Sequence, residues 1–207
     1  MLKAQHLNMA HYEFEVTTLG PGCRAALWVQ GCNFRCRGCL ATEWQPLVPA
    51  IVHTVKETAE LILDKTGLTT AGVSISGGEP MLQASALNSL LELLETKRPD
   101  WNIILFSGYT QNELIEEGRE DRLILMDKAD AFIGGKYIET LNEPSGLRGS
   151  SNQEIFFKKK SKFNQTQQME ILNYHKKIEV RISREKLFTI GIPHISHRKT
   201  QAASTSP

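Results

Sequence analysis

Short apolar runs that end in glycine and alternate with helical stretches constrain the fold of this chain more than any other feature. Apolar runs at 73–75, 102–106 and 130–133 are each followed by a glycine-containing turn. Between the first two, apolar residues recur at helical spacing over 82–94. Such alternation of strands and helices predicts βαβ units and a mostly parallel sheet.

Further elements extend this pattern at both ends of the chain. Residues 11–18 alternate polar and apolar side chains, and 25–29 form a compact apolar run, so both are predicted strands. The sequence at 54–57 is a capping box that predicts a helix from about Val55, ended by Gly67. Residues 178–182 and 187–192 alternate like a terminal hairpin.

The loops after the strands are expected to meet at one place. Right-handed crossovers bring the carboxyl ends of parallel strands to the same edge of a sheet, where ligands bind in such folds. The loops at 31–39, 76–80, 107–109 and 134–135 all follow predicted strands. We therefore expect a single site built from these four loops.

The first of these loops contains three of the four cysteines. Cys32, Cys36 and Cys39 are spaced C-x3-C-x2-C. Thiolates are the preferred ligands of iron–sulfur clusters, and three of them can hold three irons of a [4Fe–4S] cube. The fourth iron then has no thiolate from this loop. An open metal position is where another molecule can bind and react.

Two other interpretations of the cysteines are open. The spacing also fits one face of a helix, with the thiols buried as small apolar groups. Gly31, Gly38 and Asn33 oppose this, because glycine weakens helices and asparagine favours turns. A structural zinc with Cys23 as a fourth ligand is the second alternative, although zinc sites usually have two separated pairs of ligands. The residues favour an iron–sulfur loop over both.

Length and charge limit the class of protein. A chain of 207 residues suits one domain, expected over 1–193, followed by a polar, disordered tail at 194–207. The net charge of +1 gives no electrostatic case for a nucleic acid or an anionic membrane as partner. No apolar stretch suggests a leader or a membrane span. A reducing, cytoplasmic location is therefore expected, in which cysteines more often bind metals than form disulfides.

These motifs resemble those of the radical S-adenosylmethionine (SAM) superfamily. The C-x3-C-x2-C loop is that superfamily's cluster motif, and Ser76-Gly77-Gly78-Glu79-Pro80 resembles its methionine-binding loop. The stretches 28–39, 107–109 and 148–153 are most similar to the activating proteins of anaerobic ribonucleoside-triphosphate reductase. The resemblance covers roughly residues 10 to 160, and the segment after Phe156 lies largely outside it.

The resemblance implies a fold and an activity. The fold is an open partial (β/α) barrel of about five or six mostly parallel strands, since a full barrel needs about 250 residues. Cys32, Cys36 and Cys39 would hold a [4Fe–4S] cluster whose open iron binds SAM. An electron from a low-potential donor such as flavodoxin or ferredoxin would cleave SAM. The resulting radical would take a hydrogen from a glycine of a large partner enzyme, anaerobic ribonucleotide reductase.

The resemblance also implies which residues contact SAM. They are Gly38, Ser76, Gly77, Gly78, Glu79 and Ser107. Glu79 and the backbone of the two adjacent glycines would receive the amino group, Ser107 would lie near the ribose or carboxylate, and Gly38 would leave room for the adenine. Two other functions remain open: a radical SAM enzyme acting on a different peptide or a small molecule, and a non-catalytic iron–sulfur or zinc binding module.

Overall fold

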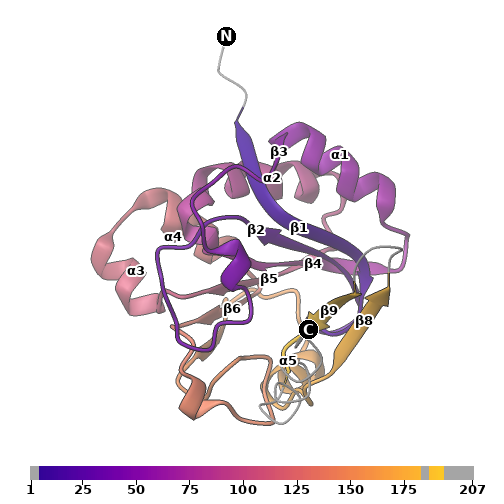
Figure 1. Ribbon diagram of the computed structural model, residues 1–207. Coiled ribbons are helices and arrows are strands. Elements are labelled where there is room, and N and C mark those ends of the chain that lie inside the picture. Colours follow the sequence, from indigo (N-terminus) through magenta and orange to yellow (C-terminus); the bar gives the residue numbers. More distant parts are fainter. Residues whose placement is uncertain (1–4, 183–186, 194–207) are drawn as a thin grey trace.

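A seven-stranded sheet forms the centre of the molecule, with the strand order β3-β1-β2-β4-β5-β6-β7. The computed structural model describes residues 5–182 and 187–193, and Figure 1 shows the arrangement of its elements. The expected polar tail and the expected hairpin turn around Arg184 lie outside the described residues.

The described elements have the following bounds. The strands are β1 (His6–Val16), β2 (Cys23–Val29), β3 (Ile51–Thr54), β4 (Thr70–Gly77), β5 (Asn102–Ser107), β6 (Ala131–Gly134), β7 (Glu154–Phe157), β8 (Ile178–Ile182) and β9 (Leu187–Gly191). The helices are α1 (Val55–Lys65), α2 (Ala84–Lys97), α3 (Gln111–Glu117), α4 (Glu120–Lys128) and α5 (Gln165–Leu172), with short 3-10 turns η1 (Thr42–Trp44), η2 (Pro80–Gln83) and η3 (Glu139–Leu141).

The centre of the sheet is parallel and its margins are antiparallel. Strands β2, β4, β5 and β6 run in one direction, whereas β1 and β7 run against their neighbours. The expected mixture of βαβ units and a mostly parallel sheet is confirmed. The sheet has more strands than expected, because β3 and β7 add an antiparallel edge on each side.

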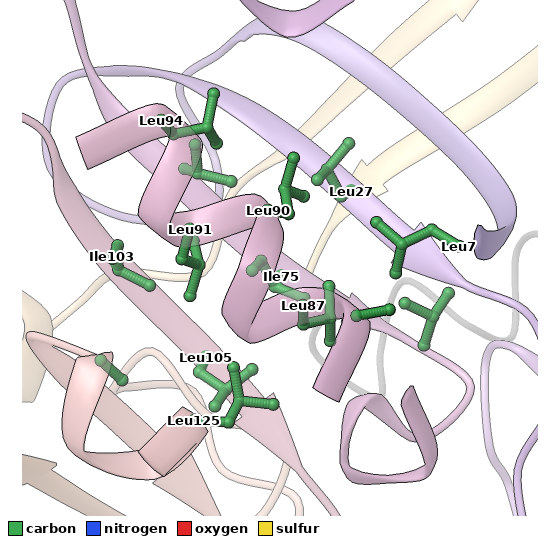
Figure 2. Close-up of a cluster of buried hydrophobic side chains, with 14 of the residues drawn as sticks. Leu7, Leu27, Ile75, Leu87, Leu90, Leu91, Leu94, Ile103, Leu105 and Leu125 are labelled. Atoms are coloured by element: carbon green, nitrogen blue, oxygen red, sulfur yellow. The ribbon is translucent and has the colours of Figure 1, made fainter. Parts of the chain in front are cut away.

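One face of the sheet is covered by α1, α2 and α4, which bury the larger core. Figure 2 shows the leucines of α2 packed onto Leu27, Ile75, Ile103 and Leu105 of three neighbouring strands. Leu90, at the centre of α2, is completely buried. Burial of a side chain of this size stabilises a fold by roughly 1.5–3 kcal/mol.

The opposite face is formed by the alternate residues of the same strands. Trp28 and Ile104 point away from the leucines of α2 because successive side chains of a strand face opposite sides. Trp28 packs against Ile190 of β9, and Ile104 lies in a second cluster with Ile171 of α5. The β8–β9 hairpin and α5 therefore cover this face (Figure 1).

Helix starts followed the local rules. Thr54 Oγ1 accepts a hydrogen bond from the Glu57 amide, and the Glu57 carboxylate accepts one from the Thr54 amide, so the capping box forms and α1 begins at Val55 as predicted. The second helix begins at Ala84 instead of Leu82. The preceding residues form the 3-10 turn η2, which is capped by Glu79.

The sequence did not predict β3, β7, α4 or α5. β3 and β7 have only four residues each and are fixed by pairing with strands distant in sequence. α5 is largely polar, although Asn164 and Gln167 form a capping box that could have revealed its start. Among the described helices, none has the length and apolar character needed to cross a membrane.

Candidate iron–sulfur and cofactor site

A cavity of about 420 Å³ lies at the carboxyl ends of the parallel strands. All four predicted loops contribute to it, together with residues that follow β6 and with β9. Its lining includes Cys32, Cys36, Cys39, Ser76, Gly77, Gly78, Glu79, Ser107, Gly108, Gly135, Gly149 and Gln153. The convergence that the sheet topology predicts is therefore observed, and the volume lies within the usual range for small-molecule pockets.

The three cysteines lie on an irregular loop. No helix forms between β2 and η1, so the interpretation of these cysteines as one face of a helix is wrong. The loop is held by backbone hydrogen bonds from Gly31 to Trp44 at 2.8 Å and from Cys32 to Gln45 at 2.9 Å. The start of the loop is thereby tied to the segment that follows it.

Backbone amides already point at two of the sulfurs. The Phe34 amide donates to Cys32 Sγ at 3.3 Å, and the Ala41 amide donates to Cys39 Sγ at 3.4 Å. Such donors stabilise a thiolate. In the protein without metal, burial raises the pKa of Cys32 to about 11 and also raises that of Cys36. Binding of a cluster must therefore displace protons from these thiols.

Cys23 lies far from this loop. It begins β2, whereas the cysteine loop follows the last residue of the same strand. A seven-residue strand spans roughly 20 Å, so Cys23 cannot share a zinc ion with Cys32. Within 5–182 and 187–193, no three His, Cys, Asp or Glu side chains are grouped closely enough for a single metal ion. Thiolates that hold a cube bind three different irons and need not meet at one point.

Gly77 and Gly78 bring the second loop onto the first. Gly77 has a φ of +111°, and a Cβ there would lie 2.3 Å from the Val29 amide nitrogen. A Cβ on Gly78 would lie 2.1 Å from the Gly31 carbonyl oxygen. The Gly78 amide donates to Val29 and the Glu79 amide donates to Gly31. Glycine is thus required here for close packing of two backbones as well as for an uncommon dihedral angle.

Comparison with known proteins agrees with this geometry. A family model described as a 4Fe-4S single cluster domain matches residues 18–156. The anaerobic ribonucleoside-triphosphate reductase-activating protein of Vibrio cholerae is 35% identical over 151 residues, which cover 70% of this chain and 94% of that protein. The proteins of the same name from Escherichia coli K12 and phage T4 are 31% and 30% identical, over 89% and 85% of their lengths.

This chain belongs to the family of anaerobic ribonucleoside-triphosphate reductase-activating proteins. The family is of the radical SAM type, so the chain is an enzyme whose cofactors are a [4Fe–4S] cluster and SAM. The donor set fits the cluster, because three thiols of one loop line one cavity and two of the sulfurs accept backbone hydrogen bonds. Further features of this activating protein refine the expected site.

Glu79 is buried between the second and third loops. Its Oε1 accepts hydrogen bonds from the Met81 amide and the Ser107 hydroxyl, both at 2.8 Å, and its Oε2 accepts one from the Gly108 amide at 2.7 Å. Burial raises the pKa of Glu79 to about 7 despite these donors. The carboxyl group therefore ties the end of β4 to the end of β5, while part of the residue borders the cavity.

Two other expected SAM contacts have distinct surroundings. The hydroxyl of Ser107 donates to Glu79 and accepts from the Tyr109 amide at 3.0 Å, so it helps to shape the loop. Gly38 is not among the residues that line the cavity. The carboxyl group of Glu139 lies 2.7 Å from the position that a Cβ on Gly38 would occupy.

The segment at 147–153 is partly buried and borders the cavity. Leu147 and Ser150 are completely buried, while Gly149 and Gln153 line the cavity. The Gln153 side chain donates to the Gly135 carbonyl at 2.7 Å and accepts from the Gly149 amide at 2.7 Å. A single amide side chain thus joins this loop to the end of β6. The resemblance at 148–153 was the only signal in the sequence that pointed to it.

Aromatic residues at the site were also missed. Phe34 of the cysteine loop packs edge-on against Tyr109, with ring centroids 4.8 Å apart, and Asn33 donates to the Tyr109 hydroxyl at 2.7 Å. Trp28 of β2 and Trp44 of η1 also line the cavity. These contacts join segments far apart in the sequence, and periodicity along the chain does not reveal them.

Proposed function

We propose that this chain cleaves SAM reductively and generates a glycyl radical on anaerobic ribonucleoside-triphosphate reductase. The observation that carries the proposal is that three thiols and residues 76–79 border one cavity at the carboxyl ends of the parallel strands. Family membership, with 94% coverage of the Vibrio cholerae activating protein, supports the same function.

The cofactors supply the reaction and the chain supplies the surroundings. When bound, the reduced cluster and SAM provide a carbon-centred radical that removes a hydrogen atom from a glycine Cα. Cys32, Cys36 and Cys39 would hold the cluster by three of its irons. The backbone and side chains of 76–79 would hold SAM against the remaining iron, and Ser107 would contribute from the adjoining loop. Gly38 would leave room for the adenine.

The remaining tasks are exclusion of water and admission of the partner. Trp28, Phe34 and Phe106 line the cavity with apolar surface, which protects a reactive species from solvent.

We further propose that residues 1–193 form one radical SAM domain whose sheet is an open partial barrel, and that the open side admits a peptide loop of the reductase. A low-potential donor such as flavodoxin or ferredoxin would supply the electron, in the cytoplasm.

The test is anaerobic reconstitution with iron and sulfide, followed by reduction in the presence of SAM and the reductase. We expect a brown [4Fe–4S] protein, release of 5′-deoxyadenosine, and a glycyl radical signal in electron paramagnetic resonance spectra of the reductase. Cys36→Ala should remain folded by circular dichroism but lose the chromophore and both products. SAM cleavage without a radical on the reductase would instead support a different substrate, and a colourless protein that binds zinc would refute the proposal.

A further inference from the structure

The β8–β9 hairpin is an addition to the matched family region. The family model ends at residue 156, whereas the hairpin occupies Ile178–Ile182 and Leu187–Gly191. It forms its own two-stranded sheet on the face of the central sheet opposite α1 and α2 (Figure 1). Its second strand, β9, lines the cavity.

The hairpin is attached firmly to the end of β1. Glu179 accepts hydrogen bonds from the amide and the hydroxyl of Thr17, at 2.6 and 2.8 Å, and Arg181 donates to the Glu15 carbonyl at 3.0 Å. Ile190 is 1% exposed and packs with Trp28. These contacts on both strands fix the hairpin as part of the folded structure.

β9 and the residues after it form one wall of the cavity. The residues that line it are Leu187, Phe188, Thr189, Gly191, Ile192 and Pro193. The ring centroid of Phe188 lies 4.1 Å from that of His11 and 6.0 Å from those of Trp28 and Trp44. Both tryptophans border the same cavity as the three thiols. Phe188 therefore joins the hairpin to the walls of the cofactor site.

The size of the enclosed space restricts what can react. A volume of about 420 Å³ is near the lower end of the range for pockets that hold small molecules. Bound SAM would fill much of it, so a peptide that reaches the same cavity must bring little side-chain volume. An apolar side chain that can move aside discriminates weakly between ligands that differ by one methylene group. A side chain such as Phe188 that is packed against other rings has less freedom to move, so it discriminates more strongly.

We propose that β9, with Phe188 at its centre, is a specificity-determining wall that admits a partner segment whose reacting residue is glycine and excludes one that carries a side chain. This inference rests on the proposed function and assigns substrate selection to an element beyond the matched region. Phe188 acts by limiting space in the cavity, and it is not a catalytic residue.

The experiment shortens the side chain at Phe188, and so enlarges the cavity, in the reconstituted enzyme. Phe188→Ala and Phe188→Leu are assayed with the reductase and with a reductase in which alanine replaces the radical glycine. We expect the ratio of kcat/KM for the glycine form over the alanine form to fall at least tenfold in Phe188→Ala and to fall less in Phe188→Leu. A ratio within twofold of wild type in both variants would overturn the inference.

A binding measurement removes the dependence on catalysis. Peptides that carry the reductase segment with glycine or alanine are titrated against the reconstituted protein with SAM and without reductant, with the fluorescence anisotropy of the labelled peptides as the signal. We expect the Kd ratio of the alanine to the glycine peptide to fall at least fivefold in Phe188→Ala. An unchanged Kd ratio would contradict the proposed role of Phe188 in selection. A loss of folding in both Phe188 variants would also contradict it, because the residue would then serve only to stabilise the core.

The matched control is Val180→Ala, which shortens a half-exposed side chain of β8 that does not line the cavity. We expect both ratios to stay within twofold of wild type, and an equal change in this variant would assign the effect to hairpin stability. Failure of the wild-type enzyme to cleave SAM would overturn the proposed function. Normal wild-type activity with unchanged ratios would overturn only the inference.

Discussion

At the scale of single residues, Glu79 shows that one side chain of a cofactor motif also has a structural role. Its carboxyl group accepts hydrogen bonds from Met81, Ser107 and Gly108 and joins two loops of the site. The resemblance assigns the residue to SAM, whereas its buried contacts are with the protein itself. Burial raises the pKa of Glu79 to about 7.

This shift predicts a pH dependence of stability. The folded protein holds the Glu79 proton more tightly than the unfolded chain does, so its contribution is complete below about pH 4.5 and is lost as the pH rises through about 7. The loss is at most about 3 kcal/mol. In urea unfolding of cluster-free protein, we expect wild type to lose more stability than Glu79→Gln between pH 5 and pH 8. Equal losses in the two proteins would show that Glu79 stays ionised when folded.

At the scale of elements, the packing of the β4 turn against the end of β2 positions the cysteine loop. The Gly78 amide donates to Val29 at 2.7 Å and the Glu79 amide donates to Gly31 at 2.8 Å. The glycine motif therefore supports the cysteine loop as well as bordering the cavity. Two motifs that are separate in the sequence act as one structural unit.

A methyl group at Gly78 should separate these elements. Its Cβ would lie 2.1 Å from the Gly31 carbonyl oxygen, so Gly78→Ala should cost roughly 1–3 kcal/mol or more and lower the Tm by about 2–4 °C per kcal/mol. We expect less iron and sulfide per chain after reconstitution. Gly67→Ala is the control, because the nearest atom to its Cβ would be 4.0 Å away. Full cluster content in Gly78→Ala would show that the loop tolerates displacement.

At the scale of the whole molecule, the parallel sheet separates the cysteines into two groups. Cys23 starts β2 and pairs in register with Thr70, at the amino end of β4, whereas the other three cysteines follow the carboxyl end. Only the carboxyl edge carries the cavity that all the site loops share. The fourth cysteine therefore lies away from the candidate metal site.

The corresponding prediction concerns Cys23→Ala. Since Cys23 lies roughly 20 Å from the cysteine loop, the variant should bind the same amounts of iron and sulfide as wild type. Metal and sulfide analysis of the reconstituted proteins, with Cys36→Ala as the variant expected to fail, makes the comparison. A loss of iron in Cys23→Ala would revive the four-cysteine alternative.

Much of the fold followed from local rules. Short apolar runs located β2, β4, β5 and β6, and the capping box at Thr54 located the start of α1. The glycine turns after these strands marked the loops that meet at the cavity. Local rules failed for β3 and β7, because four-residue edge strands are stabilised by partners that lie far away in the sequence.

The sequence by itself predicted the three candidate thiol ligands and the edge of the sheet on which they lie, because cysteine spacing and strand direction are local properties that parallel topology converts into a common position. The tertiary structure alone decided what encloses that site. The burial of Glu79, the link from Gln153 to Gly135 and the wall formed by β9 each join segments distant along the chain. Such contacts depend on how the elements pack in three dimensions, and no periodicity along the sequence encodes them.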